Sequence, residues 1–151
     1  MSDERQREEL RVAAWALARG ARLGALGTLD AQSGHPYTSL VEVCPRADEQ
    51  SVLLLISKLA EHTVNLMADT RATLLITDAW SAPEGLAHAR VTLVGEALRI
   101  EDAAEAEAAR QAFVALHPHA EGYSRFKDFS IWSLRVMRAR YIEGFGKMGW
   151  V

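Results

Sequence analysis

Cysteine, proline and long apolar runs are all scarce in this 151-residue sequence. The single cysteine, Cys44, has no partner for an internal disulfide, and one thiol does not make a metal cluster. The longest apolar run, residues 52–56, is far too short to cross a bilayer, and the polar N-terminus lacks the apolar segment of a secretory signal. We therefore expect a cytoplasmic protein in a reducing compartment, with no membrane partner.

The charge pattern gives no sign of a nucleic-acid partner. The formal net charge is −3, and the basic residues are spread along the chain rather than gathered in a block. Hydrophobic residues make up 49% and charged residues 25%, which is typical of a globular protein. This length suffices for a core without disulfides or a structural metal, and it predicts a single domain over residues 1–151.

Hydrophobic periodicity predicts a mainly β protein of the α+β class, with three peripheral helices. The helices are expected at 3–19, at 59–68, and from the N-cap Asp102 to just before Pro118. The strands are expected at 22–29, 36–44, 51–57, 71–78, 88–99 and 129–143. Residues 51–57 are largely apolar, as in a strand buried on both faces. Short connections favour antiparallel pairing, and closure of six strands into a small barrel removes the exposed edges.

The first candidate site lies where the strand at 51–57 is followed directly by a helix. A helix N-terminus offers unpaired N–H groups and a positive dipole end, which suit a phosphate. Ser57 and Thr63 add hydroxyl groups, Lys58 adds a positive charge, and His62 lies one turn into the helix. The alternative is that Ser57 only caps the helix while His62 faces solvent.

Two other segments are weaker candidates. The strand at 36–41 carries Thr38 and Ser39 on opposite faces, where hydroxyl groups can meet a planar heterocycle or simply pair across strands. The C-terminal segment 144–150 combines three glycines with two aromatic side chains and a methionine. This composition favours docking onto a partner subunit, or packing of the tail on its own barrel.

Motifs of metal and hydrolytic chemistry are missing from the sequence. The five histidines occur without HExxH or Cys-x-x-Cys, so we expect no zinc site, and we interpret His117-Pro118-His119 as a solvated helix end. The sequence also lacks a Walker loop, GxGxxG and a Ser-His-Asp order. It therefore identifies no catalytic residue.

The order of elements and five motifs resemble the FMN-binding split-barrel proteins of the pyridoxamine 5'-phosphate oxidase-like group. Within that group, the haem-utilisation (HugZ-like) branch is the most similar. The resemblance covers residues 8–150. The motifs are PYTSLV at 36–41, SKLAEHTVNL at 57–66, RVTLVGEA at 90–97, YSRFKDF at 123–129 and ARYIEGFG at 139–146.

The resemblance implies a homodimer with two FMN sites at the subunit interface. By this likeness, Ser57, Lys58, His62 and Thr63 hold the FMN phosphate, with Leu59 beside them. Thr38 and Ser39 line the isoalloxazine ring. Weaker candidates for cofactor contact, some of them reaching across from the other subunit, are Arg90, Phe145 and Lys147.

Three functions follow as expectations. The first is an FMN-dependent oxidoreductase acting on a small molecule, because the flavin carries the redox chemistry and needs no acid–base pair from the protein. The second is a haem-binding or haem-degrading protein that uses His88, His117 or His119. Because the last histidine is His119, we do not expect haem ligation by the C-terminal histidine that haem-degrading members of the group use. The third is a non-catalytic flavin-binding module.

Overall fold

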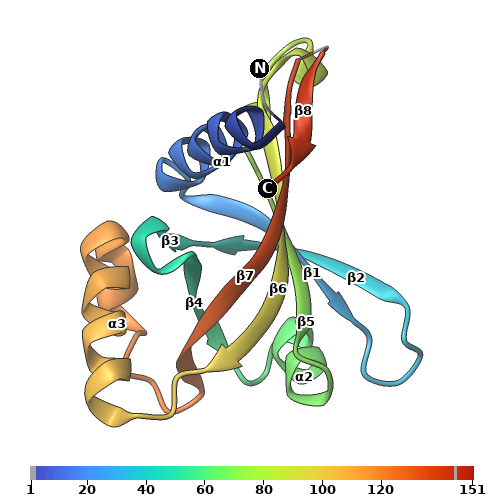
Figure 1. The fold of residues 1–151 in the computed structure, drawn as a ribbon. Helices are drawn as coiled ribbons and strands as arrows, with labels where there is room; N and C mark the ends of the chain where they lie inside the picture. The colour runs from blue at the N-terminus through green and yellow to red at the C-terminus, as the bar shows by residue number, and fades with distance from the viewer. Residues whose placement is uncertain (1–2, 145) are drawn as a thin grey trace.

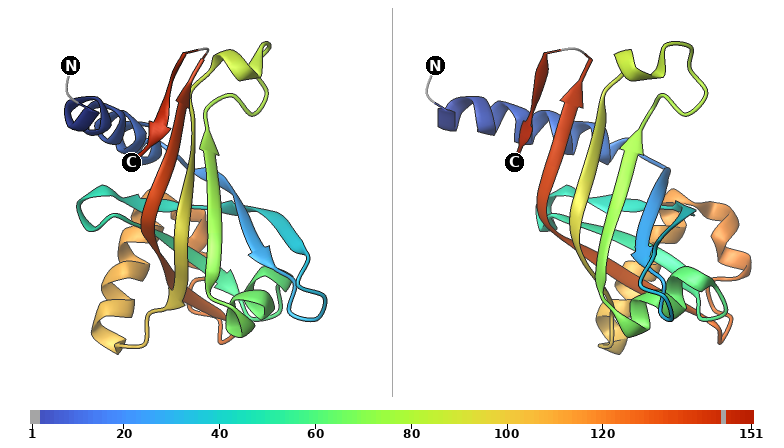
Figure 2. Two further views of the ribbon diagram at one scale, coloured as in Figure 1. Left: turned by 45° about the vertical axis from the view of Figure 1, so that its right-hand side comes forward. Right: turned by 90° about the vertical axis from the view of Figure 1, so that its right-hand side faces the viewer.

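The structure is a computed structural model that describes residues 3–144 and 146–151. One antiparallel sheet dominates it, with the strand order β2-β1-β5-β6-β7-β4-β3, and β8 also pairs with β7. The sheet curls strongly into a half-barrel, so that its two ends cross in Figures 1 and 2. The strands are β1 (Leu23–Leu29), β2 (Pro36–Glu42), β3 (Cys44–Arg46), β4 (Ser51–Ser57), β5 (Arg71–Thr77), β6 (Arg90–Arg99), β7 (Phe129–Glu143) and β8 (Lys147–Trp150).

The described chain thus has eight strands, and the sequence-based count of six was wrong. The expected strand at 36–44 ends at Glu42, and β3 follows as a separate strand in which Pro45 lies opposite Val52. Proline is tolerated there because β3 is an edge strand. The second missed strand, β8, returns along β7 after Gly144, whose φ of +55° glycine adopts without strain.

Strand β4 is buried on both faces, as its apolar sequence predicted. Val52 and Leu54 belong to the larger core, which fills the curl of the sheet. Leu53 and Leu55 point the other way, into a smaller core that includes Phe113 of the third helix. The outer face of β4 and its neighbours is therefore covered by a helix rather than by solvent.

Three helices surround the sheet: α1 (Asp3–Arg19), α2 (Glu61–Ala68) and α3 (Ala103–Leu116). Helix α3 begins as predicted, since the Asp102 side chain accepts a hydrogen bond from the Glu105 N–H at 2.9 Å. Helix α2 begins two residues later than expected, because the chain first makes a turn at 58–60. None of the helices described is long and apolar enough to span a membrane.

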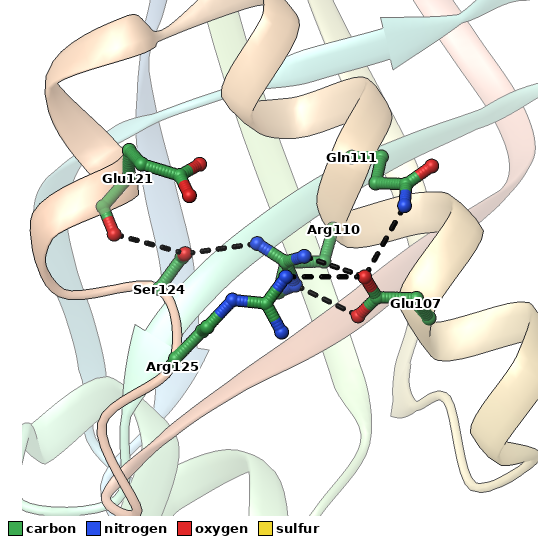
Figure 3. Close-up of polar contacts among 6 residues, drawn as sticks. All are labelled: Glu107, Arg110, Gln111, Glu121, Ser124 and Arg125. Atoms are coloured by element: carbon green, nitrogen blue, oxygen red, sulfur yellow. Dashed lines mark hydrogen bonds and ion pairs between the residues drawn. The ribbon is translucent and has the colours of Figure 1, made fainter.

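A buried guanidinium ties α3 to the segment that follows it (Figure 3). Arg110 donates to both carboxylate oxygens of Glu107, at 2.9 and 2.6 Å, and to the hydroxyl of Ser124 at 3.1 Å. The hydrogen bonds from Arg110 lower the pKa of Glu107 to about 2, so this carboxylate stays ionised. The contacts hold the short helix η3 (Pro118–Gly122) against α3, since Ser124 lies two residues after its end.

The sheet depends on a close approach of two strands at a β-bulge. Val94 pairs with Arg138, whereas Gly95 pairs with Val136, which leaves one extra residue in β7. A Cβ atom on Gly95 would overlap the main-chain carbonyl of Arg135, so the backbone would have to shift.

We expect Gly95→Ala to lower the free energy of unfolding by about 3 kcal/mol, the upper end of overpacking costs. Urea unfolding followed by circular dichroism measures the change. Gly122→Ala is the matched control, because a Cβ atom there meets nothing within 4 Å. The control is expected to change stability by less than about 0.5 kcal/mol. Equal effects of the two substitutions would contradict the close approach.

Candidate functional site

Two of the sequence-predicted residues meet where β2 faces α2. The hydroxyl of Ser39, in β2, lies 3.0 Å from Nδ1 of His62 in the first turn of α2. Strand β2 is held in place by its pairing with β1, in which Ser39 is opposite Leu26. The tertiary structure therefore joins two motifs that lie more than twenty residues apart in the sequence.

The same corner holds two buried polar atoms without a hydrogen-bond partner in the described chain. They are Nε2 of His62 and the hydroxyl oxygen of Thr63. Burial lowers the pKa of His62, so its ring is neutral at pH 7. Buried polar atoms are almost always hydrogen-bonded in folded proteins. Both atoms are therefore available to form a hydrogen bond with a bound polar ligand.

The predicted phosphate cradle at Ser57 is less favourable than the sequence suggested. The hydroxyl of Ser57 donates to the carboxylate of Asp128 at 2.8 Å and accepts from the Leu59 N–H at 3.1 Å. Lys58 also donates its main-chain N–H to the Asp128 carbonyl at 2.7 Å. Asp128 therefore uses the donor that was expected to meet phosphate. Two acidic side chains therefore lie near the start of α2, namely Asp128 on Ser57 and Glu61 in the first turn of the helix.

Asn65 fixes the position of α2. Its side-chain amide donates to the hydroxyl of Thr28 at 3.1 Å, and its side-chain carbonyl accepts from the Ala31 N–H at 2.9 Å. Asn65 is almost fully buried, and these two bonds lock the helix that carries His62 onto β1. Asn65 and Asp128 lie in the motifs at 57–66 and 123–129, but sequence reasoning gave neither of them a role, because each acts on a segment far away in the chain.

Other predicted cofactor residues lie away from this corner. Thr38 is exposed on the face of β2 opposite to Ser39. Arg90 pairs with Ile142, whereas Ser57 pairs with Phe129, thirteen residues earlier in β7 (142 − 129 = 13). At ~3.3 Å per residue the two ends are about 40 Å apart along that strand.

Strand β8, in the C-terminal segment, also lies at the far end of the sheet from α2 (Figure 1). Strand β8 pairs with β7, and the Trp150 ring lies 4.1 Å from the guanidinium of Arg138. Lys147 lies 3.5 Å from the carboxylate of Glu143. The described part of the tail thus packs on its own sheet, one of the two alternatives that the sequence left open. The expectation for Phe145 falls outside the described residues.

The larger clefts do not coincide with this corner. One of about 470 Å³ lies between α1 and the sheet, and its walls include Leu17, Ile76 and Trp80. Another of about 400 Å³ lies beneath α3 and includes Arg99 and Lys127. Neither cleft is lined by Ser39, His62 or Thr63. The chemistry of the side chains, rather than the depth of a cleft, therefore identifies the corner as the candidate site.

Comparison with known proteins shows consistent likenesses. A chloroplastic haem oxygenase of Arabidopsis thaliana, HOZ, is 34% identical over 138 residues, covering 91% of this chain and 40% of the plant protein. A haem-binding protein of Mycobacterium smegmatis superposes with a TM-score of 0.85 at 36% identity, covering 94% of this chain and 57% of the other. The chain thus spans less than two thirds of either relative.

More distant structures share the fold. A Clostridium acetobutylicum protein of the pyridoxinephosphate oxidase family has a TM-score of 0.70 at 12% identity, covering 95% of this chain and 94% of the other. The predicted resemblance to split-barrel proteins of this group and to the haem-utilisation branch is therefore confirmed. A family model described as the CREG β-barrel matches residues 5–151. The chain belongs to the CREG β-barrel family.

Proposed function

We propose that this protein binds haem, with FMN as the second candidate ligand. The observation that carries this proposal is the agreement of two relatives, one named a haem oxygenase and the other a haem-binding protein. Each is more than 30% identical to this chain over more than nine tenths of its length. This order reverses the expectation from sequence, which ranked flavin first.

The proposal puts haem beside the Ser39–His62 corner. Haem is a flat apolar ring with two carboxylates, and it needs apolar walls and a cation nearby. Three large apolar side chains on and next to α2 are exposed in the single chain, namely Leu59, Val64 and Met67. Lys58, which is exposed before the helix, supplies a positive charge for a carboxylate. We further propose that a second copy of the chain completes the apolar wall, in a homodimer.

His62 is the proposed iron ligand. Its Nδ1 is oriented by Ser39, and its Nε2 makes no hydrogen bond to the described chain. A neutral imidazole whose second nitrogen is oriented in this way suits iron. Because Nε2 is covered in the single chain, coordination requires the covering side chains to move aside.

The three histidines expected as haem ligands are less suited. His117 and His119 both contact the carboxylate of Glu42, on the face of β2 opposite to Ser39 and the α2 corner. His88 is exposed, with its Nδ1 3.9 Å from the carboxylate of Asp78. His62 therefore replaces them in the proposal.

FMN remains a candidate because of the unpaired Thr63 hydroxyl at the start of α2. A phosphate there would accept from that hydroxyl and from the first N–H groups of the helix. Two acidic side chains oppose it, since Glu61 lies in the first turn of α2 and the Asp128 carboxylate is bonded to Ser57 just before that helix. FMN is ranked second because the two relatives above are named for haem.

Parallel titrations distinguish the two ligands. We expect haem to bind with a Kd at or below about 1 μM, about −8 kcal/mol, with a shifted Soret band and one haem per chain. FMN is expected to bind more weakly, as measured by quenching of flavin fluorescence, and light scattering gives the mass of the complex. If FMN binds tightly and haem leaves the Soret band unmoved, the flavoprotein assignment replaces this one.

The role of His62 is tested by substitution. His62→Ala is expected to lower haem affinity at least about tenfold, because the iron loses a ligand. His35→Ala is the matched control, since His35 is an exposed histidine on the β1–β2 turn. Both variants should keep the wild-type circular dichroism spectrum. Equal haem affinity of the two variants would remove His62 from the site.

The buried, neutral state of His62 also predicts a pH dependence of stability. In the unfolded chain this ring titrates near its ordinary pKa of about 6.5, whereas burial keeps it neutral to lower pH in the folded protein. The unfolded state therefore binds more protons below pH 6.5, and stability falls on acidification. Urea unfolding at pH 7.5 and 5.5 should show a smaller loss for His62→Ala than for wild type or His35→Ala. The same loss in all three proteins would contradict a lowered pKa.

A further inference from the structure

A second polar cluster lies on the other side of β2. Glu42, the last residue of β2, meets His117, which ends α3, and His119 in η3. One carboxylate oxygen of Glu42 lies 2.8 Å from Nδ1 of His117 and 2.7 Å from Nε2 of His119. One potential ligand atom from each residue lies within 4.8 Å of the other two.

The buried ring of His117 is oriented as a metal ligand is. Its Nε2 lies 2.8 Å from the main-chain carbonyl of Val43, which only accepts, so Nε2 carries a hydrogen and donates it. Its other ring nitrogen, Nδ1, faces the Glu42 carboxylate. Histidines that bind metals commonly donate their second N–H to a main-chain carbonyl in this way. The two atoms are 2.8 Å apart, a hydrogen-bond distance, so an ion that binds both has to take the place of the proton shared between them and widen the contact slightly.

The two histidines are held by a rigid frame. Pro118 separates them, and the bond from Arg110 to Ser124 fixes the chain just after η3 (Figure 3). The Val43 N–H donates to the carbonyl of Arg22 at 2.9 Å, which fixes the carbonyl partner of His117. Ligand atoms that are positioned before binding give a more exact metal site.

The cluster is open to solvent on one side. The side chain of His119 is 61% exposed and that of Glu42 is 33% exposed, whereas that of His117 is 5% exposed. An ion can therefore enter from the His119 side, and water can occupy a further coordination position.

We propose that Glu42, His117 and His119 form a binding site for a divalent first-row transition-metal ion, with Zn²⁺ as the probe. Two imidazoles and one carboxylate suit zinc and its neighbours, and a zinc site with three protein ligands keeps a position for water. This departs from the sequence expectation of no zinc site. The third ligand lies 75 residues before the His-x-His pair, where no local motif reveals it. The site is independent of the haem proposal, because Glu42 and Ser39 point to opposite faces of β2.

A bound ion would act as a clamp. It would join the end of β2 to the turn that closes the α3 layer, and so stabilise the smaller core under α3. Because a ligand that binds only the folded state raises its apparent stability, Zn²⁺ is expected to raise the Tm of the chelator-treated protein.

The test uses the full chain, free of any affinity tag and treated with a chelator. Calorimetric titration with Zn²⁺ should give one ion per chain, and Co²⁺ should give visible d–d absorption bands. His119→Ala is the main variant, because its exposed ring can be removed without disturbing the core. We expect it to lower Zn²⁺ affinity at least about tenfold and to abolish the Tm shift.

His35→Ala, which removes an exposed histidine elsewhere, should bind Zn²⁺ like wild type. Glu42→Gln, which keeps the shape of the side chain, should weaken binding in the same direction as His119→Ala. The proposal is overturned if wild type shows no Zn²⁺ binding up to about 1 mM, which corresponds to −4 kcal/mol. It is equally overturned if His119→Ala and wild type bind Zn²⁺ with the same affinity.

Discussion

The structure depends on the burial of β4 on both of its faces. A strand with five consecutive apolar residues, 52–56, cannot leave either face in water, so the chain must supply one layer on each side. The curled sheet provides the first layer and α3 the second. The turn at the end of β4 leads into α2, and the turn at the end of α3 carries His117 and His119. One candidate site therefore follows the end of β4, and the other follows the end of α3, the helix that covers the outer face of β4.

Sequence reasoning found the elements whose signals are local. The bounds of β4 and β7 agree with the structure, and the capping by Asp102 and Glu105 placed the start of α3. It missed β3 and β8 because neither has a pattern of its own. Strand β3 is three residues long and contains a proline, and β8 is four residues long and follows glycine. Each is a strand only because a longer neighbour offers it free main-chain groups.

The candidate sites were predictable only in part, for a related reason. The sequence identified His62 and Ser39 separately, but the bond between them depends on how α2 packs against β2. The sequence also suggested that Ser57 is free to hold phosphate, whereas Asp128, 71 residues later, occupies its hydroxyl. A carboxylate from a distant segment changes the charge of a site, although nothing in the sequence around that site indicates it. Electrostatic character is thus harder to predict from sequence than helix or strand identity.

Strand β2 connects the two sites physically. Along a strand, residues separated by an odd number of positions point to opposite faces, so Ser39 and Glu42 face α2 and η3 respectively. An ion at Glu42 would stiffen the end of the strand, and Ser39 lies only three residues away, bonded to His62. For the ion to change the affinity of the Ser39–His62 corner for its ligand, it would have to move Ser39. An effect on the stability of the fold alone would not be enough. The His117 ring is already fixed by Val43, so the strand end is ordered before any ion arrives. We therefore expect metal to strengthen the α3 layer while leaving the Ser39–His62 corner largely as it is.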